Sequence, residues 1–493
     1  MPGSGEMKRM RDTGPAYAFY GDDFTGATDT LAHLARAGLR TMLFFTPPDA
    51  ARLSMLGQLD AIGVAGAART MAPHAQRQEL ARVGAAFAAL GVRVMHYKVC
   101  STFDSAPHTG SIGVAIRALR EYCANELVAI VGGQPNLRRY CVFGQLFAAA
   151  GADDEQRSIY RIDRHPTMSR HPVTPMNEAD LRVHLQRQGV EHVQSIDWPC
   201  YAAGEAALQS EVRRRLDAKS NAKHNAKPGA KPDAKPGALL FDVLDDTHLH
   251  AIGRVMTHYA SQSSPLLAVG ASSVAQAYAY ARGARAESEA VNDAPALLAR
   301  ARGPVFVLAG SLSPLTEVQI GAAHSYLRVE LDPRRMTGDA ASTYLADRVA
   351  AIAGPLRDGR NVLAYTARNV SHGTQTFRAI NEENAVHRGD GSAPPSRLAG
   401  ACATLLKNVL GAVRLQRIGI AGGDTSSFAV RALDAWGLSY LAPLSAGVTV
   451  CRLHSDRAEL DGVEIMLKGG QMGDADLFEQ LIDGFAAEPC ANR

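Results

Sequence analysis

The feature that most constrains the fold of this chain is a repeated unit: a short apolar run, a turn rich in glycine or aspartate, and then a longer helical stretch. Residues 16–20 form the first apolar run, and the helical stretch at 26–36 ends before Gly38. The same order recurs at residues 92–98 and 110–122. This alternation predicts an α/β fold in which mostly parallel sheets are flanked by helices.

The length of 493 residues exceeds what a single hydrophobic core usually serves, so we expect two domains. Residues 283–303 are polar and rich in alanine, and after them the alternation restarts with a new apolar run. We therefore expect a first domain at 16–300 and a second at 301–493, each with its own mostly parallel sheet. The N-terminal segment, 1–15, is expected to be disordered.

A stretch at residues 217–237 departs from this pattern. Alanine and lysine recur in it, prolines interrupt it, and no other apolar residue larger than alanine occurs. Such a segment cannot bury enough apolar surface to fold on a core, and each proline blocks continuation of a helix. We expect a solvated, mobile loop within the first domain.

Composition argues against several classes of function. Lys plus Arg is 52 and Asp plus Glu is 49, so a net charge of +3 gives no reason to expect nucleic acid or an anionic membrane as a partner. Apolar runs such as 305–309 are far shorter than the roughly 20 residues that a membrane helix needs. The seven cysteines never form a CxxC pair, which argues against structural zinc and a disulfide framework. We expect a cytoplasmic protein.

Two adjacent carboxylates, Asp22 and Asp23, follow the first predicted strand at the point where the first helix begins. Ligands of open α/β sheets bind at this carboxyl edge. Adjacent carboxylates are costly to concentrate unless a hydroxyl, a cation or a helix N-terminus receives them. Capping of the helix needs only one of the two, so the pair favours a catalytic role over capping alone.

A second polar segment closes the strand at 92–98. Lys98 suits a ligand carboxylate, and the hydroxyls of Ser101 and Thr102 suit ligand hydroxyls, which together favour a small polyhydroxylated acid. An ordinary polar turn is the alternative. Arg164 and His171 belong to a basic cluster in a loop bounded by prolines, and either is a candidate for an anion site.

Three glycine-rich turns follow predicted strands in the second half of the chain. Glycine lets the backbone approach a phosphate, and free N–H groups at a helix start supply donors. One such turn is commonly only a tight bend, but three at corresponding strand ends predict a phosphate cradle. No Gly-x4-Gly-Lys-Ser/Thr motif occurs, so the chain is not a P-loop protein. The candidate nucleotide-binding residues are Ser311, Ser313, Gly422, Gly423, Asp424, Thr425, Lys468 and Gly470.

Together these motifs resemble the four-carbon acid sugar kinase family, along nearly the whole chain and in the same order. The run Gly21-Asp22-Asp23-Phe24-Thr25-Gly26-Ala27 is similar to the family's acidic signature, and Lys98 with Ser101-Thr102 to its Lys-x-x-Ser-Thr segment. The glycine-rich turns resemble those of the family's nucleotide-binding domain. Phe103-Asp104-Ser105 stands where most members have Leu-Arg-Gly, and this form resembles the branch that acts on 3-oxo-isoapionate.

The resemblance implies a sugar-acid-binding N-terminal domain, a C-terminal ATP domain and a cleft between them. It implies an ATP-dependent kinase acting on a hydroxyl of a small sugar acid such as 3-oxo-isoapionate, 3-oxo-tetronate, threonate or erythronate. Asp22 or Asp23 would orient the attacking hydroxyl, Lys98 and Arg164 would hold the carboxylate, and Mg²⁺ would bridge the phosphates, with Asp424 as a candidate ligand. A non-catalytic sugar-acid sensor and a metal-dependent hydrolase stay open as alternatives, as does a homo-oligomeric state.

Overall fold

The computed structural model describes residues 14–150, 158–171, 173–224, 238–283, 297–311, 313–366 and 397–485. The N-terminal segment expected to be disordered lies almost entirely outside the described residues, and so does the lysine- and proline-rich tract beyond residue 224. Within the described part, no helix is both long and apolar enough to cross a membrane.

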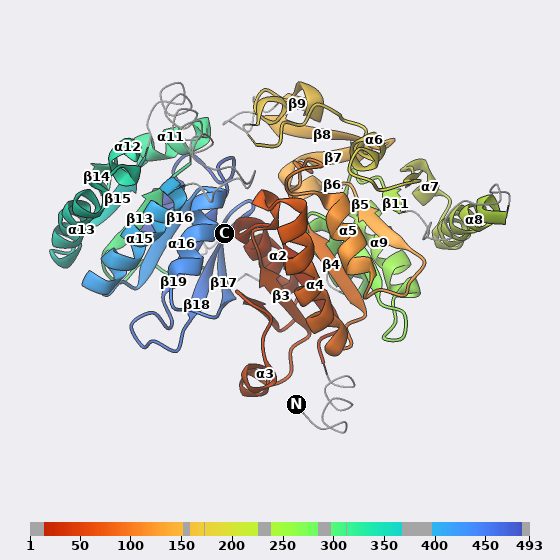
Figure 1. Cartoon of the computed structure of the whole chain (residues 1–493), viewed down its shortest axis with the longest axis horizontal. Helices are drawn as coiled ribbons and strands as arrows, with labels where there is room; N and C mark the ends of the chain where they lie inside the picture. Colours follow the sequence, from red (N-terminus) through yellow and green to blue (C-terminus); the bar gives the residue numbers. More distant parts are fainter. Residues whose placement is uncertain are drawn as a thin grey trace, which may run out of the picture.

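The first half of the chain contributes eight strands to the main sheet, in the order β10-β11-β5-β12-β4-β1-β3-β2, and all neighbouring pairs among them are parallel (Figure 1). The strands are β1 (Tyr17–Gly21), β2 (Thr41–Phe44), β3 (Ala61–Ala65), β4 (Val94–Lys98), β5 (Val128–Val131), β10 (Gln194–Ile196), β11 (Leu239–Phe241) and β12 (Leu266–Gly270). The α-helices of this half are α2 (Phe24–Arg36), α3 (Ala50–Leu56), α4 (Pro73–Ala89), α5 (Ile112–Arg120), α6 (Leu181–Gln186), α7 (Pro199–Ala202), α8 (Glu205–His224), α9 (Asp246–Tyr259) and α10 (Ser273–Ala281).

The second half contributes seven strands, in the order β17-β18-β19-β16-β13-β15-β14. The five from β19 onwards are parallel, whereas β17 and β18 run antiparallel to their neighbours. The strands are β13 (Val305–Ala309), β14 (Tyr326–Glu330), β15 (Asn361–Tyr365), β16 (Arg417–Ala421), β17 (Gly437–Ser445), β18 (Val448–His454) and β19 (Glu464–Lys468). The helices are α11 (Pro314–Ala322), α12 (Pro333–Thr337), α13 (Ala341–Arg357), α15 (Arg397–Ala412), α16 (Gly423–Ala432) and α17 (Leu477–Asp483). The expected α/β class with mostly parallel strands is confirmed.

The two halves join edge to edge along a seam, which we define as the antiparallel pairing of β2 with β17. Leu43 lies opposite Leu438 and Phe44 opposite Gly437, so the two sets of strands form one 15-stranded sheet. A Cβ atom on Gly437 would lie 2.8 Å from the Leu43 carbonyl oxygen, so only glycine lets the strands approach this closely. The rings of Phe44 and Trp436 stack at the seam.

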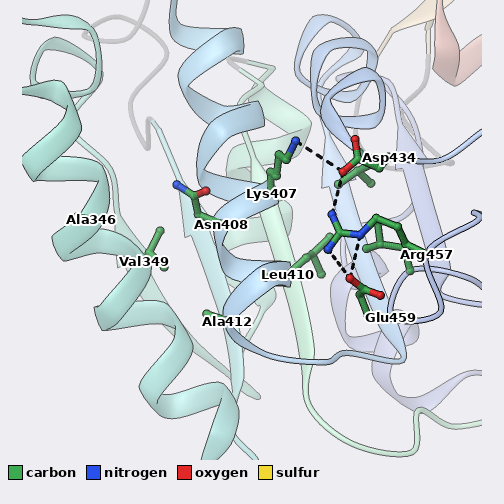
Figure 2. Close-up of a pocket in the computed structure, with 12 residues that line it drawn as sticks. Ala346, Val349, Lys407, Asn408, Leu410, Ala412, Asp434, Arg457 and Glu459 are labelled. Carbon is green, nitrogen blue, oxygen red and sulfur yellow. Dashed lines mark hydrogen bonds and ion pairs between the residues drawn. The ribbon is translucent and has the colours of Figure 1, made fainter.

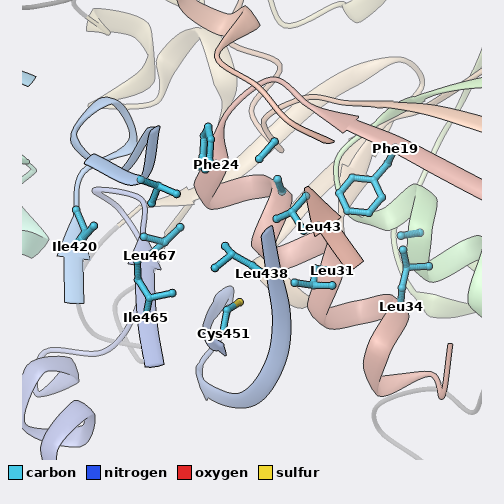
Figure 3. Packing of buried hydrophobic residues seen from close by; sticks show 14 of the residues in the cluster. Phe19, Phe24, Leu31, Leu34, Leu43, Ile420, Leu438, Cys451, Ile465 and Leu467 are labelled. Atoms are coloured by element: carbon cyan, nitrogen blue, oxygen red, sulfur yellow. The ribbon is translucent and has the colours of Figure 1, made fainter. Parts of the chain in front are cut away.

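One hydrophobic core covers the seam on one face of the sheet. Helix α2 packs against both halves there, on α10 of the first and on β17, β18 and α16 of the second. Figure 3 shows Phe24 and Leu31 of this helix beside Leu438 and Leu467, which all belong to a single buried cluster. On the opposite face the two halves have separate cores. The halves are therefore packed as one body along α2.

A small antiparallel sheet lies beside the first half and was not expected from the sequence. Its strands are β6 (Gly133–Gln134), β7 (Arg139–Val142), β8 (Gln145–Ala150) and β9 (Ser158–Arg161), and the 3₁₀ turns η4 (Ile162–Arg164) and η5 (Met168–Arg170) follow it. Helix α6 follows these turns, and Asp180 caps it by accepting a hydrogen bond of 2.9 Å from the Arg182 N–H.

Helix α8 corrects one expectation about the tract at 217–237. The helix continues to His224, so the first residues of that tract are helical and do not belong to a loop. Alanine and lysine are good helix formers, and the first proline of the tract comes only at Pro228.

A leucine deletion at the seam tests whether the halves unfold together. Leu438 is fully buried in the shared core, and Leu438→Ala should lower the free energy of unfolding by about 2–5 kcal/mol. We expect one cooperative calorimetric transition in both proteins, shifted down in the variant. The control is Met55→Ala, at a side chain that is 76% exposed. This variant should change the free energy of unfolding by less than about 0.5 kcal/mol. Two separate transitions in the unmutated protein would contradict the shared core.

Candidate active site

The carboxyl ends of β1, β3 and β4 lie in register, because Gly21 pairs with Ala65 on one side and with Lys98 on the other. The polar residues that follow these strands are therefore brought together. Asp23 caps α2: its Oδ1 accepts a hydrogen bond of 2.9 Å from the Gly26 N–H, and its Oδ2 accepts one of 2.9 Å from the Thr25 hydroxyl. Capping and participation in a charged cluster are thus combined in one residue.

Arg69 lies between the two aspartates and was missed by the sequence reasoning. It belongs to the turn η1 (Ala68–Thr70) that follows β3. Its Nη2 is 3.0 Å from Asp22 Oδ1, and its Nη1 is 2.9 Å from Asp23 Oδ2. Its position after a strand at the carboxyl edge was the available signal. Arg69 forms ion pairs with both carboxylates, so their negative charge is balanced without a bound metal ion.

The two aspartates differ in their surroundings. Burial raises the pKa of Asp22, and the opposing effect of Arg69 does not cancel it. Burial alone would also raise the pKa of Asp23, but Arg69, Lys98 and the Gly26 N–H lower it to about 2. Asp23 is therefore an ionised hydrogen-bond acceptor at any physiological pH.

Lys98 lies at the end of β4, with its side chain almost completely buried. Its Nζ is 3.7 Å from Asp23 Oδ1 and lies over Gly26. A Cβ atom on Gly26 would lie 1.5 Å from that nitrogen. The glycine of the acidic signature is thus required because the lysine ammonium occupies the place of a side chain.

The turn after Lys98 brings a further carboxylate to the site. Thr102 is buried and donates a hydrogen bond of 2.6 Å to Asp104 Oδ1, whereas Ser101 is half-buried. Burial would raise the pKa of Asp104, but the charges of Arg69 and His171 act against this and lower it. Asp104 is therefore close to the acid pair. The sequence analysis did not place this carboxylate among the candidate site residues.

Of the two basic candidates in the loop after the small sheet, only one lies near the cluster. The Arg164 side chain is 77% exposed, and its recorded ion pair is with Asp163. No described contact joins it to Lys98. His171 is half-buried, and its Nδ1 accepts a hydrogen bond of 3.1 Å from the Thr174 N–H. In the neutral ring this leaves the proton on Nε2.

The glycine-rich turns of the second half also meet, because β13, β16 and β19 end in register. Ala309 pairs with Ala421, and Ala421 pairs with Lys468. A Cβ atom on Gly310 would lie 2.2 Å from Thr425 Oγ1, and one on Gly470 would lie 2.7 Å from Ser311 Oγ. These positions are closely packed, so the turns form one continuous backbone surface.

Two further features fit a ligand at these turns. Gly422 has a φ of +123°, which other residues rarely adopt, and it lets α16 begin beside the Ser311 N–H. The buried hydroxyl oxygen of Ser313 has no hydrogen-bond partner in the structure. A buried polar atom without a partner is uncommon and is consistent with a group that a ligand satisfies.

Lys468 is completely buried, and its side chain makes hydrogen bonds that hold these turns in place. Its ammonium donates to Thr316 Oγ1 at 3.0 Å, to Gln319 Oε1 and to the Gly470 carbonyl oxygen at 3.5 Å. Burial lowers the pKa of Lys468 to about 7. All three partners are neutral acceptors that tie the third turn to α11, so the observed contacts of this lysine are internal.

The acid cluster and the glycine turns meet at the seam. A Cβ atom on Gly423, the first residue of α16, would lie 3.8 Å from Asp23 Oδ2. Asp424 follows it and keeps solvent contact, although the surrounding protein raises its pKa. Arg69, Asp23, His171 and Asp104 are the first-half residues whose charges act on it. The acid cluster of the first half therefore lies next to the first turn of α16 in the second half.

A pocket elsewhere in the second half has different chemistry. Figure 2 shows a pocket of about 560 Å³ between α13 and α15, lined by Val349 and Leu410 together with charged residues. Arg457 lies between Asp434 and Glu459 there, so these charges are already paired. None of the residues expected to act on a ligand lines this pocket.

Comparison with known proteins gives the family. A model described as a sugar-binding N-terminal domain matches residues 17–278, and one described as a nucleotide-binding C-terminal domain matches residues 306–478. A 3-oxo-isoapionate kinase of Paraburkholderia graminis is 36% identical over 98% of this chain and 97% of its own length. The chain belongs to the four-carbon acid sugar kinase family. It is a sugar-acid kinase, a transferase that uses ATP.

Other relatives agree with this assignment. A 3-oxo-tetronate kinase of Methylobacterium radiotolerans is 30% identical over 94% of this chain and 98% of its own length. Among solved structures, a Salmonella typhimurium protein superposes with a TM-score of 0.69 at 21% identity, covering 94% of this chain and 98% of that one. A Haemophilus influenzae protein gives 0.62 over the same shares, also at 21% identity. These two structures support the fold.

Gly26→Ala tests the placement of Lys98. The methyl group would displace the ammonium, and kcat/KM for the acid substrate should fall about 100-fold, as expected when a positioning group moves by an ångström or so. The KM for ATP should stay the same. The matched control is Gly400→Ala, because Gly400 lies in α15 with open space around it. An unchanged kcat/KM in the Gly26 variant would show that this lysine position is not needed.

Proposed function

We propose that this sugar-acid kinase transfers the γ-phosphoryl group of ATP to a primary hydroxyl of 3-oxo-isoapionate. The observation that supports this reaction is the closeness of Gly423 to Asp23, because a Cβ atom on Gly423 would lie 3.8 Å from Asp23 Oδ2. The glycine turns and the acid cluster are thus neighbours. The choice of substrate is supported by the 36% identity to a 3-oxo-isoapionate kinase over nearly the full length. The 3-oxo-tetronates are the next candidates, on the 30% identity of another relative.

The second half, at 301–493, is proposed to hold the nucleotide. The close packing at Gly310, Gly422 and Gly470 brings the three turns together, and backbone N–H groups at the start of α16 can donate to a polyphosphate there. Ser311, Ser313 and Thr425 add hydroxyl donors at the same turns. Lys468 stabilises the turn at Gly470 through its buried hydrogen bonds and does not pair with a phosphate. The phosphates would thus be bound mainly by main chain.

The first half, at 16–300, is proposed to hold the sugar acid. Lys98 pairs with the substrate carboxylate, and Ser101 lies on the following turn for one of its hydroxyls. Thr102 lies on the same turn, but its hydroxyl is already donated to Asp104. Asp23 accepts the hydrogen bond of the attacking hydroxyl and orients it toward the γ-phosphoryl group. Asp22 fixes Arg69, whose guanidinium offsets negative charge at the transfer step. Positioning and charge balance are the main needs of phosphoryl transfer, so a weakly basic Asp23 suffices.

Mg²⁺ fits the residues present. The described residues hold no group of three or more side chains that could ligate a metal by themselves. Magnesium in kinases commonly needs only one or two carboxylates in addition to phosphate oxygens and water. Asp424 is a solvent-accessible carboxylate at the start of α16 and would supply such a ligand. When bound, the ion would neutralise part of the charge of the phosphates.

A coupled ADP-release assay tests the function. With ATP and Mg²⁺, we expect the highest kcat/KM for 3-oxo-isoapionate within a panel that also holds 3-oxo-tetronate, threonate and erythronate. No ADP release should occur with the corresponding acids in which the primary hydroxyl is missing. ADP release that favours a tetronate at least tenfold would refute the proposed substrate, and phosphate release without ATP would refute the kinase mechanism.

Two variants should show opposite defects in this reaction. Asp23→Asn keeps the cap of α2 and the shape of the site, and we expect kcat to fall by about 10²–10⁴ while ATP binding persists. Gly423→Val adds a side chain between Asp23 and the phosphates, and we expect calorimetric ATP binding to be lost while sugar-acid binding persists. Full activity of the first variant, or unchanged ATP affinity of the second, would contradict these roles.

A further inference from the structure

The site holds one carboxylate that the proposed phosphoryl transfer does not use. Asp104 is as buried as Asp22 and Lys98, at 4% exposure. Its donor Thr102 lies on the turn that follows Lys98, and the charge of Asp104 acts on Arg69 of its own half and on Asp424 of the other, so this carboxylate lies beside the acid pair. Oδ1 of Asp104 accepts the 2.6 Å hydrogen bond from Thr102.

The backbone around Asp104 is held rigidly. Phe103 is completely buried and has a φ of +53°, an unusual conformation for an aromatic residue. Its carbonyl oxygen accepts a hydrogen bond of 2.9 Å from Ser105 Oγ and lies 3.2 Å from His184 Nε2. Gln188 donates a hydrogen bond of 2.8 Å to the same serine. Strained positions that are fixed in this way cluster at functional sites, because they place a side chain precisely.

The chemistry of Asp104 limits what it can recognise. An ionised carboxylate only accepts hydrogen bonds, and it repels both the substrate carboxylate and the phosphates. A hydroxyl of the sugar acid is a complementary group, and the metal ion that comes with ATP already has Asp424 as its proposed ligand. The reacting hydroxyl is proposed to bind Asp23 and the substrate carboxylate to bind Lys98, so Asp104 is available for another hydroxyl. 3-Oxo-isoapionate carries a hydroxymethyl branch that 3-oxo-tetronate lacks.

We infer that Asp104, held in place by Thr102, accepts a hydrogen bond from the branch hydroxyl and thereby selects the branched acid over the unbranched one. This inference rests on the proposed function and names the residue that determines its substrate. A buried acceptor built for a substrate hydroxyl discriminates strongly, because it loses its partner when the analogue lacks that hydroxyl.

The test compares both acids on one enzyme and on its variants. The measured quantity is the ratio of kcat/KM for 3-oxo-isoapionate to that for 3-oxo-tetronate. Asp104→Leu removes the acceptor at similar volume, and we expect the ratio to fall about 30-fold, as for loss of one charged hydrogen bond. General effects on Arg69 change both substrates alike and cancel in the ratio. Asp104→Asn keeps the shape if the leucine variant does not fold, and its ratio should fall about tenfold.

Thr102→Val provides an independent measurement, because it removes the donor that holds Asp104 without touching the carboxylate. We expect a smaller loss of the same ratio, with the KM for ATP unchanged. An equal fall for both acids, or an unchanged ratio, would overturn the assignment of Asp104 and leave the kinase function intact. If the unmutated enzyme does not phosphorylate the branched acid, the proposed substrate is wrong and the selective role of Asp104 is refuted with it.

Discussion

The antiparallel pairing of β2 with β17 is the constraint on which the rest of this structure depends. It turns two sheets into one and lets α2 pack across both halves. Since α2 and α16 pack against each other, their first turns lie side by side, and Asp23 comes next to Gly423. Any rotation of one half against the other would open the shared core. The separation of the acid cluster from the glycine turns is therefore set when the chain folds.

Charge balance is the second organising principle of the site. Four carboxylates, on Asp22, Asp23, Asp104 and Asp424, lie within the influence of Arg69 there, and among the residues that the structure describes Lys98 acts on the first two and His171 on the other two. Such an excess is tolerated because Arg69 contacts two of the acids directly and because backbone and hydroxyl donors satisfy Asp23. Anionic substrates entering this space need further positive charge, which the helix N-terminus of α16 and a metal ion with ATP can supply.

Much of the fold could be predicted from the sequence because buried parallel strands are continuous apolar runs with polar turns at their carboxyl ends. The same rule located Asp23, Lys98 and the glycine turns. It was not applied to the strand before Arg69, whose turn contains mostly small residues. Arg164 was chosen on charge alone, and local sequence does not report that its side chain is exposed.

Other features could not be read from the sequence because they depend on contacts between distant segments. The pairing of residue 43 with residue 438 leaves no local pattern in either strand. The small sheet β6–β9 has short strands with irregular burial, so its period is weak. The placement of Asp104 depends on the positive φ of Phe103, and the turn is held by the contact of the Phe103 carbonyl oxygen with His184 and by the hydrogen bond of Ser105 with Gln188, which are distant in sequence.

The seam also bears on how such enzymes can diversify. A new sugar-binding half acquired by recombination would have to arrive with an edge strand complementary to the resident β17, including a partner for the close approach at Gly437. It would also need an equivalent of α2 that completes the apolar layer over both halves. Replacement of a whole half would therefore disturb the seam and its core. Substitutions within turns such as that of Asp104 can change the substrate and leave the seam unaltered.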